Sequence, residues 1–185
     1  NDKNIILNKN LKQINQLIFQ IKKINHEINI QLENLDLYRF NKEHIFILGK
    51  SSLEYIAKEG ALKLKEICYI HGEGFSSSSL KHGPMALIHR DFPVILLINH
   101  ENYEKMINTY NELKSRNAYI FILTTIKEVN KLIDKKDRII FVPENEVCCE
   151  ILFMLILQHL CYNIALLKKI NPDKPKNLAK VVTVE

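Results

Sequence analysis

Short apolar runs that alternate with helical segments constrain the fold of this chain more than any other feature. The runs lie at residues 44–49, 93–98, 118–124 and 138–142. The second run reads Pro-Val-Ile-Leu-Leu-Ile, and its lack of polar alternation is typical of a strand buried on both faces. Strands of this kind between helices indicate a parallel sheet. We therefore predict an α/β fold, a three-layer α/β/α sandwich with about five parallel strands.

The segments between the runs carry the predicted helices. A strand that ends in Gly49 and leads into a helix is the usual opening of a doubly wound α/β unit. Ser51 or Ser52 can cap the N-terminus of that helix. We predict helices over residues 52–68, 101–116, 127–135 and 146–169, and a short one within 80–88 that begins near Gly83-Pro84. Residues 69–79 are predicted to be irregular or a short strand.

Both ends of the chain differ from this α/β segment. Apolar residues recur at helical spacing near the N-terminus, at Leu11, Ile14, Ile18 and Ile21. They predict one long or two shorter helices that pack on a neighbour through these residues. Residues 171–185 contain two prolines and no helical rhythm, so an extended tail is predicted. We divide the chain into a helical extension (1–40), an α/β domain (41–170) and a tail (171–185), and expect a fragment because no initiator Met opens it.

Composition and charge restrict the class of protein. The chain is 46% hydrophobic and 25% charged, with a net charge of +5, which is typical of a globular protein. The lysines are spread along the sequence, which argues against a nucleic-acid surface. The apolar run at 151–157 is too short to span a bilayer, so we predict a buried core helix and no membrane contact.

The cysteines have no spacing typical of a zinc site or of a redox pair. They are Cys68, Cys148, Cys149 and Cys161. We expect buried thiols in a reducing compartment, and therefore a cytoplasmic protein.

Three charged residues of the helix at 52–68 are candidates for chemistry. Glu59, Lys63 and Glu66 are spaced i, i+4 and i+7, so they share one helix face. An exposed ion-pair ladder explains this spacing. A carboxylate held ionised by the ammonium, able to take a proton from carbon beside a carbonyl, explains it too.

Other candidates lie in turns and in the tail. His82 precedes Gly83-Pro84 in a turn between elements, where it can exchange protons near neutral pH or lie at the surface as an ordinary histidine. The serines at 76–79 suggest a phosphate loop or, more simply, a flexible polar loop. The segment 49–52 lacks the P-loop pattern, and Lys180 by itself suggests only a solvated lysine.

Three segments together resemble a known family. They are EGALKLKEICYIHGEGF at 59–75, LKHGPMALI at 80–88 and NLAKVVTVE at 177–185. In order, spacing and terminal placement they resemble the second sugar-isomerase (SIS) subdomain of glutamine–fructose-6-phosphate aminotransferases, over roughly residues 46–185. The resemblance implies a flavodoxin-like SIS fold and an enzyme that converts fructose 6-phosphate and glutamine-derived ammonia to glucosamine 6-phosphate.

The resemblance also implies roles for single residues. Glu66 falls on the proton-shuttling carboxylate and Lys63 on its neighbouring lysine. His82 falls on the ring-opening histidine that one subunit of a homodimer supplies to the other, and Lys180 on the lysine proposed to form a Schiff base with the sugar. Two further positions bind substrate in the resemblance: Ala179 through its backbone, and Glu73. No metal and no cofactor are implied.

The resemblance leaves part of the enzyme outside this chain. The phosphate-binding loop belongs to the preceding SIS subdomain, and a separate glutaminase supplies ammonia, so we expect this chain alone to be inactive. The family usually has Gly-Glu where this chain has Ser78-Ser79, which affects the loop before His82. A sugar-phosphate-sensing regulatory SIS module and an inactive dimerisation scaffold are the alternatives.

Overall fold

A single parallel sheet organises the computed structural model, which describes residues 2–33 and 35–177. The strand order is β2-β1-β3-β4-β5, and every neighbouring pair is parallel. The strands are β1 (His44–Gly49), β2 (His71–Ser76), β3 (Pro93–Ile98), β4 (Tyr119–Thr124) and β5 (Arg138–Phe141). Strands β3 and β4 are buried along their whole length, which confirms the interpretation of their uninterrupted apolar runs.

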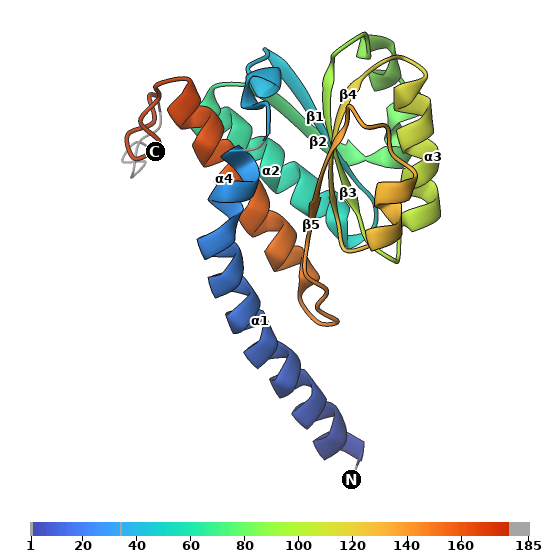
Figure 1. Ribbon diagram of the computed structural model, residues 1–185, viewed down its shortest axis with the longest axis vertical. Coiled ribbons are helices and arrows are strands. Elements are labelled where there is room, and N and C mark those ends of the chain that lie inside the picture. Colours follow the sequence, from blue (N-terminus) through green and yellow to red (C-terminus); the bar gives the residue numbers. More distant parts are fainter. Residues whose placement is uncertain (1, 34, 178–185) are drawn as a thin grey trace, which may run out of the picture.

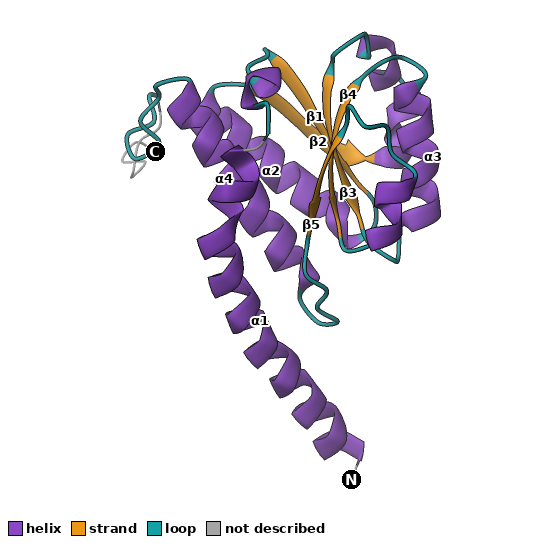
Figure 2. Cartoon of the chain, viewed as in Figure 1, coloured by secondary structure: helices purple, strands orange, loops and turns teal. Residues whose placement is uncertain are grey.

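Helices cover both faces of the sheet, as predicted for a three-layer sandwich. They are α1 (Asp2–Glu33), α2 (Ser52–Cys68), α3 (Tyr103–Lys114) and α4 (Cys149–Leu167). Figures 1 and 2 show α1, α2 and α4 on one face and α3 on the other. Each face has its own apolar core. Leu64, Phe121 and Phe153 belong to the α2/α4 core, and Phe46, Leu96 and Met106 belong to the α3 core.

Helix α4 is long and apolar enough that length and composition alone would allow it to cross a membrane. Its apolar side chains instead pack against α1 and α2 in the core. The buried set is Leu152, Phe153, Ile156, Leu157, Leu160, Cys161, Ile164 and Ala165. The prediction of a buried core helix is therefore confirmed.

From β2 to β3 the structure refines the sequence prediction. Residues 69–79, predicted to be irregular or a short strand, contain the short strand β2. The short helix predicted to begin near Gly83-Pro84 is present as a 3₁₀ helix, η3 (Pro84–Leu87), with Pro84 in its first turn. A second 3₁₀ helix that was not predicted, η2 (Ser77–Lys81), precedes it. Gly83 separates them with a φ of +131°, a value that favours glycine and ends a helix. The helix predicted over 127–135 is likewise only a 3₁₀ helix, η4 (Lys127–Lys131).

The predicted serine cap of α2 is wrong. Ser51 occupies the cap position with a φ of +56°, and its side chain makes no capping hydrogen bond. The Ser52 hydroxyl is buried without a hydrogen-bond partner among the described residues. The positive φ of Ser51 differs from the extended backbone of the usual cap residue, which explains the missing bond.

Helix α1 is one continuous helix, but the predicted packing residues are mostly wrong. Leu11, Ile14 and Ile18 remain 44–50% exposed. The buried apolar residues are Leu17, Ile24, Ile28 and Leu32, and Gln20 is buried with them. Helix α4 begins at Cys149 and covers only the second half of α1, so it decides which side of α1 enters the core. Figure 1 shows the first half of α1 extending away from the sheet.

All four cysteines are free thiols, but the predicted burial holds only for Cys68 and Cys161, since Cys148 and Cys149 are half-buried. Cys68 and Cys161 are buried, and the Cys68 thiol donates a hydrogen bond of 3.1 Å to the Cys161 carbonyl. The neighbouring Cys68 and burial raise the pKa of the Cys161 thiol, so it stays neutral and unreactive. The compartment of the protein remains a prediction.

Candidate active site

The strongest candidate group for chemistry is an ion-pair cluster near the C-terminus of α2. The Lys63 ammonium lies 2.6 Å from the Glu66 carboxylate and 3.4 Å from Glu59. The Lys63 and Glu66 side chains are only 26% and 30% exposed. The hydrogen bond to Glu66, and then the charges of both carboxylates, raise the pKa of Lys63 despite the opposing effect of burial. Lys63 therefore stays charged at neutral pH beside a half-buried carboxylate.

Two glycines of β2 fix how α2 lies on the sheet. A Cβ added at Gly74 would lie 2.2 Å from the Ala57 carbonyl oxygen, and one added at Gly72 would lie 2.9 Å from that of Ala61. Helix α2 therefore runs antiparallel to β2, and its last turn reaches the amino end of that strand. Glu66 lies in this last turn, near the amino edge of the sheet. The sequence predicted the helix and its ion pairs, but not this close approach.

His82 lies on the other face of the sheet. It follows η2, whose Lys81 lies 2.6 Å from Glu112 of α3, and α3 covers the face opposite α2. His82 is exposed. Its position in a turn between two elements is as predicted. Within one copy of the chain, however, the structure does not bring His82 and Glu66 together, because the sheet separates them.

Glu73 also points away from α2. Its neighbours Gly72 and Gly74 face α2, so Glu73 projects from the opposite face of β2. There it lines a cleft of about 270 Å³ whose other lining residues are His44, Phe46, His71, Leu87, His89 and Phe92. His44 and His71 are paired across the strands, with their Nδ1 atoms 3.1 Å apart. The sequence analysis did not identify this histidine pair. It predicted residues 69–79 to be irregular or a short strand, and so it could not pair His71 with a neighbouring strand.

The C-terminal tail returns to α2 before the described residues end. The Lys176 amide donates a hydrogen bond of 2.7 Å to the Tyr69 hydroxyl, and its ammonium lies 4.6 Å from the centre of the Tyr69 ring. Tyr69 caps the C-terminus of α2, close to Glu66 in the sequence. The predicted site residues Ala179 and Lys180 lie outside the described residues.

The serine-rich segments lie at the carboxyl edge of the sheet. Ser77 is buried, and Ser78 accepts a hydrogen bond of 2.8 Å from the Lys50 ammonium. The segment is thus part of a 3₁₀ helix tied to the β1–α2 turn rather than the flexible loop that the sequence favoured. This bond depends on the hydroxyl group of Ser78.

The fold and this arrangement match a known domain. The family model described as SIS domain matches residues 40–168, which include the whole sheet and the helices from α2 to α4. The chain belongs to the SIS domain family.

The relatives of this SIS domain are longer enzymes, and the matched segment is only one part of each. The chain is 45% identical over 175 residues to a probable glutamine–fructose-6-phosphate aminotransferase (isomerizing) of Acanthamoeba polyphaga mimivirus, covering 93% of this chain and 28% of the relative. It is 38% identical over 182 residues to the aminotransferase of that name from Methanosarcina mazei, covering 93% and 29%. The chain thus spans less than a third of the length of these curated relatives.

A solved structure gives the same picture. The C-terminal domain of glucosamine-fructose-6-phosphate aminotransferase from Francisella tularensis superposes with a TM-score of 0.77 at 30% identity. The match covers 92% of this chain and 48% of that one. The SIS domain described here therefore corresponds to about half of a larger domain.

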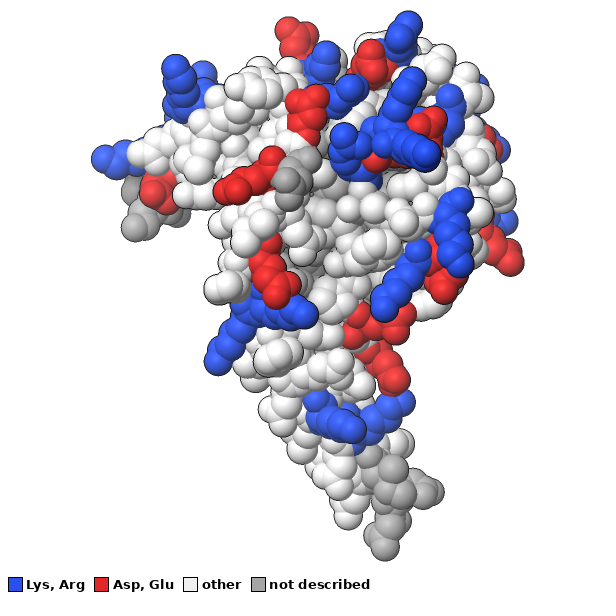
Figure 3. All heavy atoms as spheres, viewed as in Figure 1, with Lys and Arg blue, Asp and Glu red and all other residues white. Residues whose placement is uncertain are grey.

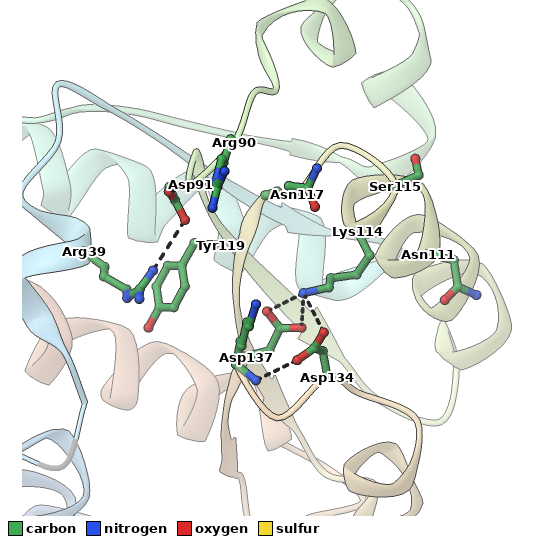
Figure 4. Close-up of a pocket in the computed structure, with 12 residues that line it drawn as sticks. Arg39, Arg90, Asp91, Asn111, Lys114, Ser115, Asn117, Tyr119, Asp134 and Asp137 are labelled. Carbon is green, nitrogen blue, oxygen red and sulfur yellow. Dashed lines mark hydrogen bonds and ion pairs between the residues drawn. The ribbon is translucent and has the colours of Figure 1, made fainter.

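A large cleft among the described residues contains none of the predicted site residues. It measures about 850 Å³ and lies beside the C-terminus of α3, the start of β4 and the segment before β5. Figure 4 shows Lys114 pointing toward Asp134 and Asp137. The Lys114 ammonium is 3.0 Å from Asp137, which is buried and also accepts a 2.8 Å hydrogen bond from the Tyr110 hydroxyl. Burial raises the pKa of Tyr110, and it raises the pKa of Tyr119 to about 12.

These groups stabilise one another, which favours a structural role for the large cleft. Arg39 is held in the same way, between Asp36 at 3.2 Å and Asp91 at 3.5 Å. Figure 3 shows lysines and arginines interspersed with acidic residues over the visible face of the SIS domain. The described residues on this face form no broad basic region of the kind that binds nucleic acid.

Proposed function

We propose that this SIS domain supplies the proton-transfer half of an isomerase active site. The reaction is that of a glutamine–fructose-6-phosphate aminotransferase, in which fructose 6-phosphate and ammonia from glutamine give glucosamine 6-phosphate. The observation that carries the proposal is the half-buried Lys63–Glu66 pair at the end of α2. It lies in a domain whose relatives, at 45% and 38% identity, bear this enzyme's name.

The chemistry follows from the residues. Moving a proton between C2 and C1 of an open-chain sugar requires a carboxylate that can accept and return it, and Glu66 is that group. The Lys63 ammonium favours the ionised carboxylate between proton transfers. Lys180 condenses with the open-chain sugar carbonyl to give an imine and water, and ammonia then displaces the lysine amine to give the imine of the sugar, whose neighbouring C–H is more acidic. Ala179 contacts the sugar through its backbone. The anchoring of the tail beside Tyr69, shortly before these residues in the sequence, supports their reaching Glu66.

Two copies are needed if His82 opens the sugar ring. The sheet separates His82 from Glu66 within one copy, which supports a homodimer in which each chain supplies His82 to the site of the other. Glu73 lies on the same face as His82, so its contribution to sugar binding is also made across such a dimer. Ser78 and Ser79, where the family has Gly-Glu, remove an acidic group next to this segment.

The remaining parts of the proposed enzyme lie outside this chain. The preceding SIS subdomain supplies the phosphate-binding loop, and a glutaminase domain supplies ammonia. The coverage of about 28% of the relatives' length supports this arrangement. We place residues 1–40 in a helical linker, 41–170 in the second SIS subdomain and 171–185 in an active-site tail, in a cytoplasmic enzyme. The isolated chain is expected to be inactive, so detectable formation of glucosamine 6-phosphate by it would contradict the proposal.

A substitution at Glu66 tests the proposal in the longer polypeptide that includes the preceding subdomain and the glutaminase. Glu66→Gln keeps the size of the side chain but removes its basic function. We expect synthesis of glucosamine 6-phosphate to fall by roughly a hundredfold or more, while glutamine hydrolysis persists. Glu54→Gln is the matched control, because Glu54 also forms an ion pair with a lysine of the same helix, Lys58, and its side chain is 29% exposed, as half-buried as that of Glu66. Synthesis retained in Glu66→Gln would remove Glu66 from the mechanism.

A further inference from the structure

Tyr69, the residue that ends α2, has a backbone conformation that large side chains rarely adopt. Its φ of +53° and ψ of +41° are left-handed, and its amide donates the hydrogen bond to the Leu64 carbonyl that closes the helix. Glycine or asparagine usually occupies this position, because other L-residues are strained there. Glycine would make the same backbone bond without strain. The reason for a tyrosine therefore lies in its side chain.

The Tyr69 side chain holds the C-terminal tail at Lys176. Its hydroxyl accepts a hydrogen bond of 2.7 Å from the Lys176 amide, and the ammonium of the same lysine lies 4.6 Å from the centre of the ring. That second distance is typical of a cation–π interaction. The amides of Asp173 and Lys174 donate to Asn171, within the tail itself. Those two bonds shape the tail, and the two contacts of Tyr69 attach it to the domain.

Local structure leads the chain from α4 back to Tyr69. Lys169, just after α4, is left-handed with a φ of +57°, and the Ile170 amide donates to the Ala165 carbonyl at 2.9 Å. This pattern ends a helix and reverses the chain. Ile170 then packs against the α2/α4 core. The tail is thus directed toward the end of α2, where Tyr69 fixes it.

The attachment at Tyr69 brings the proposed catalytic groups within reach of each other. Glu66 precedes Tyr69 by three residues, which is less than one turn of helix. Lys180 follows Lys176 by four residues, and four residues span at most about 14 Å. Lys180 lies outside the described residues, so it is this length of chain that limits its distance from the attachment point.

We propose that Tyr69 is a positioning residue of the isomerase site. Its hydroxyl fixes the tail at Lys176, so that Lys180 meets the open-chain sugar beside Glu66. This inference rests on the proposed function, because it takes the role of Lys180 from there. A tail that is attached before the sugar binds does not lose that conformational freedom during binding, which favours binding of the sugar.

The kinetics of the longer polypeptide, with the preceding subdomain and the glutaminase, test this role. Tyr69→Phe removes the hydroxyl and keeps the ring beside Lys176. Fewer free enzyme molecules then have an attached tail, which lowers the apparent affinity for the sugar. We expect the KM for fructose 6-phosphate to rise roughly fivefold, the usual effect of one lost hydrogen bond. The kcat should change by less than about twofold, because bound sugar itself holds Lys180.

Tyr55→Phe is the matched control. Tyr55 also lies on α2 with a lysine ammonium, that of Lys58, 5.5 Å from its ring centre, but it precedes Tyr69 by about four helical turns. We expect it to leave KM unchanged. A KM in Tyr69→Phe equal to that of the control would contradict the proposal. A loss of kcat as large as that of Glu66→Gln, with KM unchanged, would also contradict it, because Tyr69 would then act in the chemical step.

Amide hydrogen exchange in the 185-residue chain tests the attachment without sugar or turnover. NMR should show that the Lys176 amide exchanges roughly fivefold faster in Tyr69→Phe than in the parent chain. The amides of α2 and β3 should exchange at the same rate in both, which verifies that the variant is folded. An unchanged rate at Lys176 would contradict the attachment.

The two proposals fail in different ways. Lys180→Arg keeps the charge but cannot form the imine. If Lys180→Arg and Glu66→Gln both retain synthesis of glucosamine 6-phosphate, the proposed function fails and the role of Tyr69 fails with it, although faster exchange at Lys176 would still demonstrate the attachment. If both variants abolish synthesis and Tyr69→Phe has the KM of the control, only the role of Tyr69 fails.

Discussion

The two halves of α1 have similar sequences and opposite environments. Ile14 and Ile28 both follow the same apolar spacing, yet Ile14 is 44% exposed and Ile28 is 1% exposed. The difference comes from α4, which begins at Cys149 and lies beside only the second half. A helical pattern thus specifies which residues can be buried together, while the neighbouring element decides which of them are.

The largest expected effect is a difference in stability between substitutions in the two halves of α1. Ile28→Ala leaves a cavity between α1 and α4, and we expect a loss of about 3 kcal/mol in the free energy of unfolding. Ile14→Ala is the matched substitution and should change it by less than about 0.5 kcal/mol. Urea unfolding of both variants, at a concentration where the chains are monomeric, measures the contrast. Equal losses would mean that both halves are buried.

The next effect concerns the polar contact at the boundary between the halves. Asn145 is 6% exposed and donates to Gln13 and Gln20 of α1 at 3.1 Å. Its side-chain oxygen accepts from the amides of Val147 and Cys148. We expect Asn145→Ala to lower the free energy of unfolding by about 2 kcal/mol, because it leaves buried groups unpaired.

Hydrogen exchange locates that loss. Exchange in Asn145→Ala should accelerate in α1 and in the loop before α4, while the strands stay protected. Faster exchange spread evenly over β3 and β4 would contradict a local role for Asn145.

A smaller effect depends on pH and involves only the half of α1 that α4 covers. Burial lowers the pKa of His159 from 6.5, so the unfolded chain binds a proton more readily than the folded one. The resulting stability is present above about pH 6.5 and is lost as the pH falls toward the lowered value. His159→Gln should flatten this part of the curve of unfolding free energy against pH. An unchanged slope in the variant would assign the titration to another group.

The smallest effect is expected in the exposed half. Lys9 and Glu146 form an ion pair of 2.6 Å, with side chains 64% and 63% exposed. Lys9→Ala should change the free energy of unfolding by less than about 0.5 kcal/mol, because solvent screens such pairs. A larger loss, seen in thermal unfolding at low salt, would show that the first half of α1 is fixed more firmly than its exposure indicates.

The sequence analysis succeeded where a local pattern decides the structure. Uninterrupted apolar runs predicted four of the strands, and spacing along α2 predicted the pairing of Lys63 with Glu66. It was less successful for β2, whose sequence His-Gly-Glu-Gly-Phe-Ser has little strand character. That strand forms because Gly72 and Gly74 let α2 pack directly on its backbone. Contact between segments that are distant in sequence therefore determines this strand. A short local stretch of the sequence does not contain that information.

The sequence by itself determined the parallel sheet, the core helix α4 and the charged cluster of α2. These follow from residue spacing and side-chain chemistry, which act over a few neighbouring positions. Only the tertiary structure decided which half of α1 is covered, and that the sheet separates Glu66 from His82. Both depend on where elements remote in sequence come to lie. The first leaves Leu11 and Ile14 of α1 exposed, and the second keeps the two proposed catalytic groups apart within one copy of the chain.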